Sequence, residues 1–363
     1  MNTRLGVLLP TNHGQWDDAR RLVDVGVRAE RLGFDSVWAN DTLLGPRVEP
    51  LTMLAALAPV TERVTLGTAA LLPALRRPIV AAQALASVDH LSAGRLVVTV
   101  GAGFPGRSEP EYAMSQVPWE RRFGRLDDTV ALWRALWSGE RAFHGTVLDF
   151  DELPASTPSY RAGGPPIWLG GASRSALERT GRLYDGWLPY PPDPAGYDAG
   201  LRTVRDAAGA AGRPAEAITP ALFVTVLVTG DTDDTGDTGD TADAADAADA
   251  AETGDAADDA AGAERGEREL DAYCRASYGL PYEVVRTIQV MVAGPAARVA
   301  ATLARYVEAG AEHLVCRIAA PTLDAQLDQM ELLAGTVRPR LTGRSPGTTT
   351  TAATSPASPG RQG

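Results

Sequence analysis

The sequence predicts a (β/α)8 TIM barrel with a disordered acidic insertion after strand seven. Short apolar runs alternate with amphipathic helical segments from the first residues, and eight such runs occur along the 363-residue chain. The connections between most of them are short, and strands that are apolar throughout indicate a parallel sheet covered by helices. A doubly wound open sheet is the alternative with the same alternation.

The eight expected strands are short, apolar and bounded by glycine, proline or turn residues. They are Leu5–Leu9, Phe34–Trp38, Val64–Thr68, Arg95–Val100, Ile167–Leu169, a strand opening at Trp187–Leu188, Ala221–Val228 and His313–Ile318.

The expected helices follow these strands and show apolar residues at helical spacing. They are Leu22–Leu32, Leu51–Val60, Ile79–Leu91, Trp119–Trp137, one starting near Ser173, Tyr197–Ala208, Leu270–Tyr278, Pro295–Ala309 and Leu323–Val337. Two further segments are expected to be extended: Phe143–Phe150, as a strand or hairpin arm, and Arg286–Val292.

The net charge of −12 belongs to one segment. Between Asp231 and Glu269 there are 15 acidic residues against two arginines, so the rest of the chain is close to neutral. Residues 229–266 contain no large apolar side chain and are expected to be disordered, because burial cannot offset the ordering entropy. Residues 342–363, rich in Thr, Ser, Pro and Gly, are expected to form a disordered tail. Residues 1–341 then form one barrel domain interrupted by the insert.

The sequence also bounds the compartment and the partners. It has no run of 18 apolar residues, its first residues lack the pattern of a secretory signal, and its two cysteines make no disulfide framework. We therefore expect a cytoplasmic protein with a small-molecule substrate and with neither a membrane nor a nucleic acid as partner.

A phosphate site is predicted after the fifth strand. Ile167–Leu169 is followed by Gly170, Gly171, Ala172 and Ser173, where a helix begins. Glycines let backbone N–H groups approach an anion, and a helix N-terminus carries partial positive charge. The alternative is that the two glycines form a tight turn and that Ser173 is an N-cap.

The carboxyl ends of the other strands carry few acid–base groups. The expected active-site face holds no Ser-His-Asp set, no paired carboxylates and no cluster of metal ligands, so we expect no metal site and expect a cofactor to perform the chemistry. Asn40 and Asp41 follow the second strand and are the candidate catalytic residues. Asp41 either caps the following turn or contacts the cofactor or substrate. His313 starts the eighth strand, at the wrong end for catalysis.

Several motifs, in this order and spacing, resemble the luciferase-like flavin monooxygenase superfamily, which includes bacterial luciferase, alkanesulfonate monooxygenases and deazaflavin-dependent oxidoreductases. The motifs are Leu32–Trp38, Glu62–Thr68, Leu91–Leu96, Val100–Gly103, Pro166–Gly171, Asp185–Trp187 and Gly310–Leu314.

The resemblance implies a (β/α)8 barrel that binds a flavin or deazaflavin at its C-terminal mouth. It implies that Gly170 to Ser173 hold the cofactor phosphate and that Gly101 and Gly103 let the ring approach strand four. It also places a non-proline cis peptide beneath the ring, at Thr68-Ala69.

One branch of the family fits poorly. The sugar-phosphate dehydrogenases place Asp-His after strand two and a glutamate after strand four. Here Asp41 is followed by Thr42, and Phe104 aligns with the glutamate. We therefore expect the histidine and the acid of that branch to be absent.

The expected function is that of a flavin-dependent monooxygenase, which uses reduced FMN and oxygen on a small organic substrate. A separate flavin reductase and a homodimeric state are further expectations. A deazaflavin-dependent hydride-transfer enzyme and a non-catalytic flavin-binding barrel are the alternatives.

Overall fold

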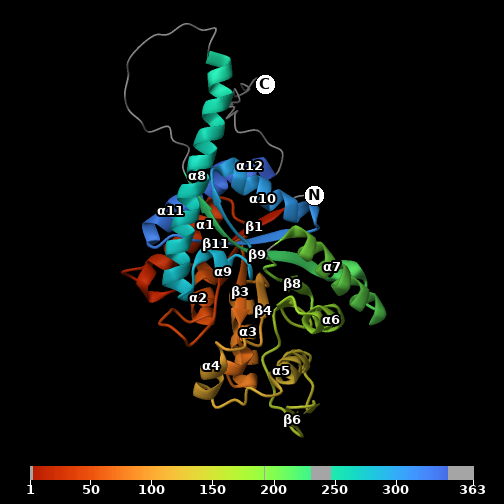
Figure 1. The fold of residues 1–363 in the computed structure, drawn as a ribbon. Coiled ribbons are helices and arrows are strands. Elements are labelled where there is room, and N and C mark those ends of the chain that lie inside the picture. Colours follow the sequence, from red (N-terminus) through yellow and green to blue (C-terminus); the bar gives the residue numbers. More distant parts are fainter. Residues whose placement is uncertain (1–2, 192, 230–246, 342–363) are drawn as a thin grey trace, which may run out of the picture.

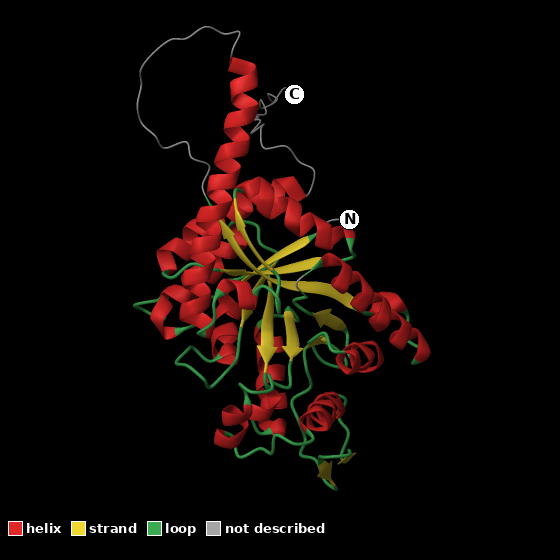
Figure 2. Ribbon diagram, viewed as in Figure 1, coloured by secondary structure: helices red, strands yellow, loops and turns green. Residues whose placement is uncertain are grey.

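The computed structural model describes residues 3–191, 193–229 and 247–341, with residues 247–259 as backbone only. Eight parallel strands surround one lumen, and helices cover them on the outside (Figures 1 and 2). In chain order the strands are β1 (Arg4–Leu8), β2 (Ser36–Ala39), β3 (Thr65–Leu71), β4 (Leu96–Val100), β7 (Ile167–Gly170), β8 (Gly186–Leu188), β9 (Thr219–Val228) and β11 (His313–Ile318). Pairing of β8 with β9 closes the barrel, so the predicted fold is confirmed.

The outer helices lie close to the expected positions. They are α1 (Arg21–Arg31), α2 (Pro50–Leu57), α3 (Pro78–Leu91), α5 (Arg122–Trp137), α6 (Arg174–Leu183), α7 (Pro194–Ala210), α8 (Ala247–Tyr278), α10 (Ala296–Glu308) and α11 (Leu323–Leu332). Short helices that the sequence did not predict are α4 (Glu109–Met114), α9 (Tyr282–Val285) and α12 (Arg338–Leu341). None of the described helices combines the length and hydropathy needed to cross a membrane.

Two extended elements lie outside the barrel. The first is the hairpin of β5 (Phe143–His144) and β6 (Asp149–Phe150), which agrees with the expected hairpin arm. The second is β10 (Met291–Gly294), which pairs with the last residues of β9 and starts later than the expected segment.

Two tryptophans fill the lumen of the barrel. Trp38 of β2 and Trp168 of β7 are buried and tilted against each other, with ring centroids 5.4 Å apart. A Cβ on Gly67 would lie 2.1 Å from the Trp38 ring, and one on Gly186 would lie 2.4 Å from the Trp168 ring. Both glycines are therefore required by packing, and the middle of the barrel has no room for a ligand.

The N-terminal end of the lumen is closed by a buried polar group. Nε2 of His313 lies 2.6 Å from Oγ of Ser36, which also accepts a hydrogen bond from Nε1 of Trp38. Burial lowers the pKa of His313 to about 3, so the imidazole is neutral at ordinary pH. His313 therefore links β11 to β2 past the intervening β1, at the end of the barrel away from the catalytic face, as expected.

Helix α8 reaches further toward the N-terminus than predicted. Residues 230–246 of the expected disordered insert, and the expected tail 342–363, lie outside the described residues. The segment 260–266, however, belongs to α8 and packs on the barrel, so the predicted boundary at residue 266 is wrong. Gly262 approaches Pro295, and Gly266 approaches the backbone of Ala293 and Gly294. Because these residues are small, the helix can approach the barrel closely. Packing of a helix on a barrel more commonly uses large apolar side chains.

Substitution of Gly266 tests this contact. Helix propensity alone predicts that Gly266→Ala stabilises the protein by about 1 kcal/mol. The new Cβ, however, would lie 2.7 Å from Cβ of Ala293 and 3.0 Å from the backbone nitrogen of Gly294. We expect overpacking to prevail and the free energy of unfolding to fall by about 1–3 kcal/mol.

Thermal unfolding of Gly266→Ala and Gly209→Ala provides the measurement and its control. Gly209 lies in α7, and a Cβ there would meet no described atom within 4 Å, so this variant should melt slightly above the parent. A Gly266→Ala protein that melts as high as the Gly209→Ala protein would show that the end of α8 does not pack on β10.

Candidate active site

The carboxyl ends of the strands form a mouth above the two tryptophans. Side chains alternate along a strand, so the next inward positions after the filled layer lie here. They are Asn40, Ala69, Thr99, Gly101, Gly170, Tyr190, Thr225 and Arg317. The hydroxyls of Thr99 and Thr225 are buried without a described hydrogen-bond partner. The mouth therefore offers unused polar groups in a mainly apolar setting.

The C-terminal part of α8 covers one side of the mouth. Nη1 of Arg317 donates to the Tyr278 hydroxyl at 2.6 Å, and its guanidinium lies 5.3 Å from the centroid of the Tyr273 ring. The rings of Phe104 and Tyr190 also lie at the mouth, with their centroids 6.0 Å apart. Burial raises the pKa of Tyr190, so its hydroxyl remains protonated. Aromatic side chains thus line the mouth.

The four glycines predicted to contact a cofactor separate into two pairs. Gly103 and Gly171 have φ angles of +75° and +107°, where only glycine is unstrained. For Gly101 and Gly170, an added Cβ would meet its nearest described atom at 3.7 Å, which is an ordinary contact. The protein's own packing therefore does not require glycine at these two inward positions. Space for a ligand is a direct explanation for both.

The turn after β7 has the geometry expected for an anion cradle and also for a capped helix. The Ser173 hydroxyl accepts a hydrogen bond from the backbone nitrogen of Ala176 at 3.3 Å, so Ser173 is the N-cap of α6. Its hydroxyl also lies 3.3 Å from the Ser175 hydroxyl, and it can donate to a ligand when Ser175 donates to it. Ala172 and Ser173 are exposed. The carbonyl of Gly171 is fixed by Nε1 of Trp187 at 2.8 Å. Both predicted roles of this turn are therefore compatible.

Strand β3 differs from the prediction in two ways. The non-proline cis peptide joins Ala69 and Ala70, one residue after the expected Thr68-Ala69 bond. The Thr68 hydroxyl donates to the Thr99 carbonyl at 2.8 Å. Thr68 lies between Gly67 and Ala69, which both face the lumen, so its own side chain points away from the lumen. Thr68 therefore faces the helices and does not reach the mouth, whereas Ala69 does.

Asn40 and Asp41 occupy different environments. Asn40 accepts a hydrogen bond from the Thr11 hydroxyl at 3.0 Å and lies at the mouth. The Asp41 carboxylate accepts from the backbone nitrogen of Leu72 at 2.9 Å and forms an ion pair with Arg76 at 2.5 Å. Asp41 thus ties the end of β2 to the loop after β3, which is a structural role. No contact excludes a further role toward a ligand.

A buried carboxylate lies beside Thr42, contrary to the expectation that no acid follows strand four. Phe104 is half-exposed, but Glu111 of α4 is fully buried and accepts hydrogen bonds from the Thr42 hydroxyl and from the backbone nitrogen of Leu43. Sequence alignment at strand four missed Glu111 because a six-residue helix brings it back from further along the chain. The expected absence of histidine stands, since Thr42 is a threonine.

Two nitrogens of an arginine near the mouth lack hydrogen-bond partners. Nε and Nη1 of Arg47 are buried and donate to no described acceptor. Burial lowers the pKa of Arg47, and the nearby Arg317 and Arg107 lower it further, while Asp41 and Glu111 oppose this. Such an arrangement is costly unless an anion completes it.

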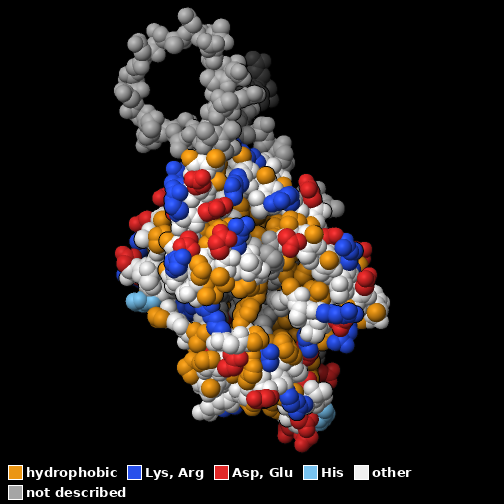
Figure 3. Space-filling model, viewed as in Figure 1, with side chains coloured by type: hydrophobic (Ala, Val, Ile, Leu, Met, Phe, Trp, Pro, Cys, Tyr) orange, Lys and Arg blue, Asp and Glu red, His pale blue; other side chains and the backbone are white. Residues whose placement is uncertain are grey.

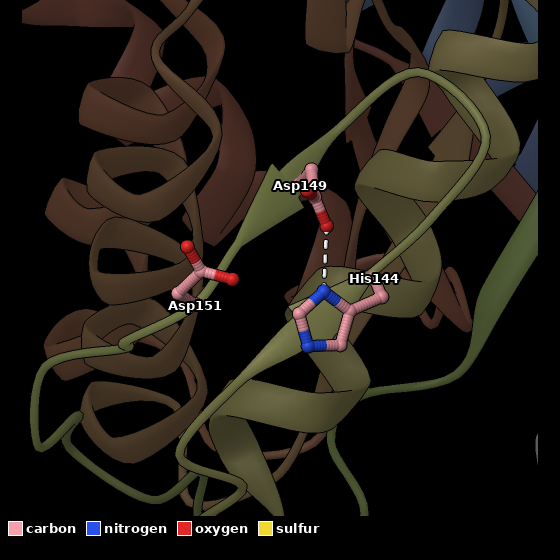
Figure 4. Close-up of side chains that lie close together, drawn as sticks. All are labelled: His144, Asp149 and Asp151. Carbon is pink, nitrogen blue, oxygen red and sulfur yellow. Dashed lines mark hydrogen bonds and ion pairs between the residues drawn. The ribbon is translucent and has the colours of Figure 1, made fainter.

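A second group of polar side chains lies far from the mouth, on the β5–β6 hairpin. His144, Asp149 and Asp151 place their ligand atoms within 4.8 Å of one another. Figure 4 shows Nδ1 of His144 directed at Asp149, 2.6 Å away, with Asp151 beside the pair. All three side chains are exposed, and His144 and Asp149 are direct cross-strand partners. Cross-strand pairing explains this geometry, so we assign no metal to it.

The structure is a (β/α)8 barrel with an aromatic mouth, two open glycines and a glycine-rich turn at a helix start. The family model for luciferase-like monooxygenases matches residues 3–313. The chain therefore belongs to the luciferase-like monooxygenase family, as its motifs predicted.

Individual relatives and structures agree with this assignment. An F420-dependent glucose-6-phosphate dehydrogenase of Nakamurella multipartita is 34% identical over 222 residues, which are 58% of this chain and 64% of that protein. The match thus spans less than two thirds of that relative. An F420-dependent secondary alcohol dehydrogenase, solved with an F420-acetone adduct, has a TM-score of 0.69 at 18% identity and covers 94% of this chain and 99% of its own. The monooxygenase RslO1 of Streptomyces bottropensis has a TM-score of 0.67 at 22% identity, covering 93% and 99%. The two structures establish the shared fold.

The structural role of Asp41 is tested by Asp41→Ala. The variant leaves the guanidinium of Arg76 with Glu49 as its remaining carboxylate partner, in a site where the Asp41 side chain is only 5% exposed. We expect the free energy of unfolding to fall by about 2–3 kcal/mol. Asp198→Ala, which breaks an exposed ion pair with Arg202, should leave the melting temperature unchanged. An Asp41→Ala protein of parental stability but reduced turnover would instead favour a role toward cofactor or substrate.

Proposed function

We propose that the protein is an oxidoreductase that uses the deazaflavin F420 to transfer hydride to or from an alcohol or carbonyl group. The observation that carries this proposal is the 34% identity to a relative named as an F420-dependent dehydrogenase. The F420-dependent alcohol dehydrogenase of the same fold supports it. We therefore place deazaflavin, the alternative cofactor expected from the sequence, above FMN.

The residues of the mouth fit a flat ring with a phosphate-bearing side chain. Gly101 and Gly170 leave open space at two neighbouring inward positions, and Ala69–Ala70 forms the floor between them and β2. The exposed turn from Gly171 to Ser173 would hold the phosphate at the start of α6. When bound, the deazaflavin supplies a carbon centre that accepts or releases hydride.

The protein's own residues would position the substrate and handle the proton. Oxidation of an alcohol releases one hydride and one proton, and the reverse reaction consumes both. Glu111 is the buried carboxylate beside Thr42, whose hydroxyl donates to it. We infer that Glu111 takes up or returns this proton. If the substrate does not contact Glu111 directly, the Thr42 hydroxyl relays the proton between them. The aromatic mouth lowers the water content around the reacting atoms.

Glucose 6-phosphate is not the substrate that we propose. The sugar-phosphate branch of the family has a histidine where this chain has Thr42. A threonine hydroxyl does not titrate near neutral pH, so the two residues are not interchangeable in proton transfer.

A monooxygenase that uses reduced FMN and oxygen is the second candidate, and it would need a separate flavin reductase. The family description and the fold shared with RslO1 favour it. The two candidates differ in one measurement. Oxygen consumption with reduced FMN identifies the monooxygenase, whereas absorbance change of F420 with an alcohol, without oxygen consumption, identifies the dehydrogenase. If neither reaction occurs but a flavin binds, the protein is a binding barrel.

Gly170→Ala tests the cofactor position. The added Cβ lies no closer than 3.7 Å to a described atom, so the fold should be unaffected. We expect F420 to bind at least tenfold more weakly, which corresponds to about 1.4 kcal/mol, because the methyl group occupies the cofactor's space. Gly14→Ala is the control, since a Cβ there meets no described atom within 4 Å. Gly171 is unsuitable, because its φ of +107° makes any side chain strained. Unchanged F420 binding in Gly170→Ala, measured by fluorescence titration, would move the site elsewhere.

Glu111→Gln tests proton transfer. The amide keeps an acceptor for the backbone nitrogen of Leu43 but holds no transferable proton at neutral pH. We expect kcat to fall at least tenfold while the Kd for F420 and the melting temperature stay close to parental values. Glu109→Gln, in the same helix, is the matched control and should keep parental kcat. Equal kcat in the parent and Glu111→Gln would exclude the proposed role.

A further inference from the structure

A hollow of about 760 Å3 opens beside the mouth. It lies between the loop after β2, the loop after β3 and helix α4. Its lining consists of Asp41, Thr42, Leu43, Leu44, Gly45, Pro46, Arg47, Glu49, Pro50, Leu75, Arg76 and Met114. Because Thr42 both lines the hollow and bonds to Glu111, a molecule in the hollow would reach the proposed proton-transfer group.

The hollow contains one arginine with unsatisfied donors. Arg76 pairs with both Asp41 and Glu49, so its charge is fully compensated and these three groups together carry one net negative charge. Arg47 also lines the hollow, and its Nε and Nη1 are buried without a described hydrogen-bond partner. Arg317 and Arg107 lower the pKa of Arg47, whereas Asp41 and Glu111 raise it. The two unpartnered guanidinium nitrogens of Arg47 are therefore the donors in the hollow that a carboxylate would satisfy.

The rest of the hollow is apolar. Leu43 is 50% exposed, Leu44 40% and Met114 58%, and Leu75 completes this side. On the face seen in Figure 3, hydrophobic side chains gather over the region of α3 and α4. Exposed large hydrophobic side chains grouped around a concavity indicate a site for an apolar ligand.

We propose that this hollow binds a substrate with an aliphatic body and one carboxylate, with the carboxylate on Arg47 and the aliphatic part on Leu43, Leu44 and Met114. A guanidinium and a carboxylate form a charge-assisted hydrogen bond. A phosphate dianion fits less well, since Arg76 with Asp41 and Glu49 forms a net negative group in the same hollow and would repel a second negative charge. This inference names the substrate class of the proposed oxidoreductase and depends on that function for turnover, but not for binding.

Calorimetric titration of the full chain, without cofactor, tests the binding step. The probes are decanoate and the uncharged decanol, and the variants are Arg47→Met and the control Arg202→Met. Methionine keeps most of the apolar volume of the arginine stem. The Arg202 side chain is 63% exposed, forms a surface ion pair with Asp198 in α7 and does not line the hollow.

The parent and Arg202→Met should bind decanoate more tightly than decanol. In Arg47→Met, decanoate should bind at least tenfold more weakly while decanol binding changes less than threefold. Decanoate that does not bind the parent, or that binds Arg47→Met as tightly as the parent, would overturn the proposal.

A second variant covers the case in which Arg47→Met fails to fold. Leu44 is exposed, so Leu44→Asp should fold, and its carboxylate would repel decanoate from the same hollow. Decanoate affinity at least tenfold lower in this variant supports the site, and parental affinity overturns it. F420 titration of the same samples keeps the two proposals separate. A variant that loses decanoate binding but still binds F420 shows an effect on the hollow alone. Absence of F420 binding in the parent would contradict the proposed function.

Discussion

The packing of Trp38 and Trp168 in the lumen determines where a ligand can bind. These two rings occupy the space that a Cβ on Gly67 or Gly186 would need, so the middle of the barrel is solid protein. Below them, His313 and Ser36 close the N-terminal end. Only the carboxyl ends of the strands remain open, as the general architecture of such barrels requires. The inward glycines therefore serve two purposes. Gly67 and Gly186 leave space for the tryptophan rings in the lumen, whereas Gly101 and Gly170, at the mouth, face open space.

Much of the fold could be predicted from the sequence, because each barrel strand is a short apolar run and each helix has a clear start or stop. The strand His313–Ile318 agrees in both bounds, and Ser173 is the helix cap that its position suggested. The start of α8 could not be predicted in the same way. Its segment from 260 to 266 packs through Gly262, Ala263 and Gly266. These residues are small, and the composition of the segment gave no reason to expect that they would be buried.

The candidate site was predicted only in outline. The glycine-rich turn and the open glycines follow from local patterns at strand ends. The direction of the Thr68 side chain depends on which alternate residues face the lumen, and a one-residue difference in register reverses it. Glu111 reaches Thr42 through a short helix, and Asp41 meets Arg76 across 35 residues. Contacts of this kind arise from tertiary structure and leave no local signal in the sequence.

In the arrangement that we propose, the mouth and the adjoining hollow form one site, with the ring over Ala69–Ala70 and Gly101, the phosphate at Gly171 to Ser173 and the substrate beside Glu111. A crystal structure of the protein with F420 tests this arrangement most directly. The account predicts electron density for the deazaflavin ring in contact with Gly101 and Ala69–Ala70, and for the phosphate at the start of α6. A ring bound elsewhere on the barrel, or a phosphate away from the turn after β7, would contradict it.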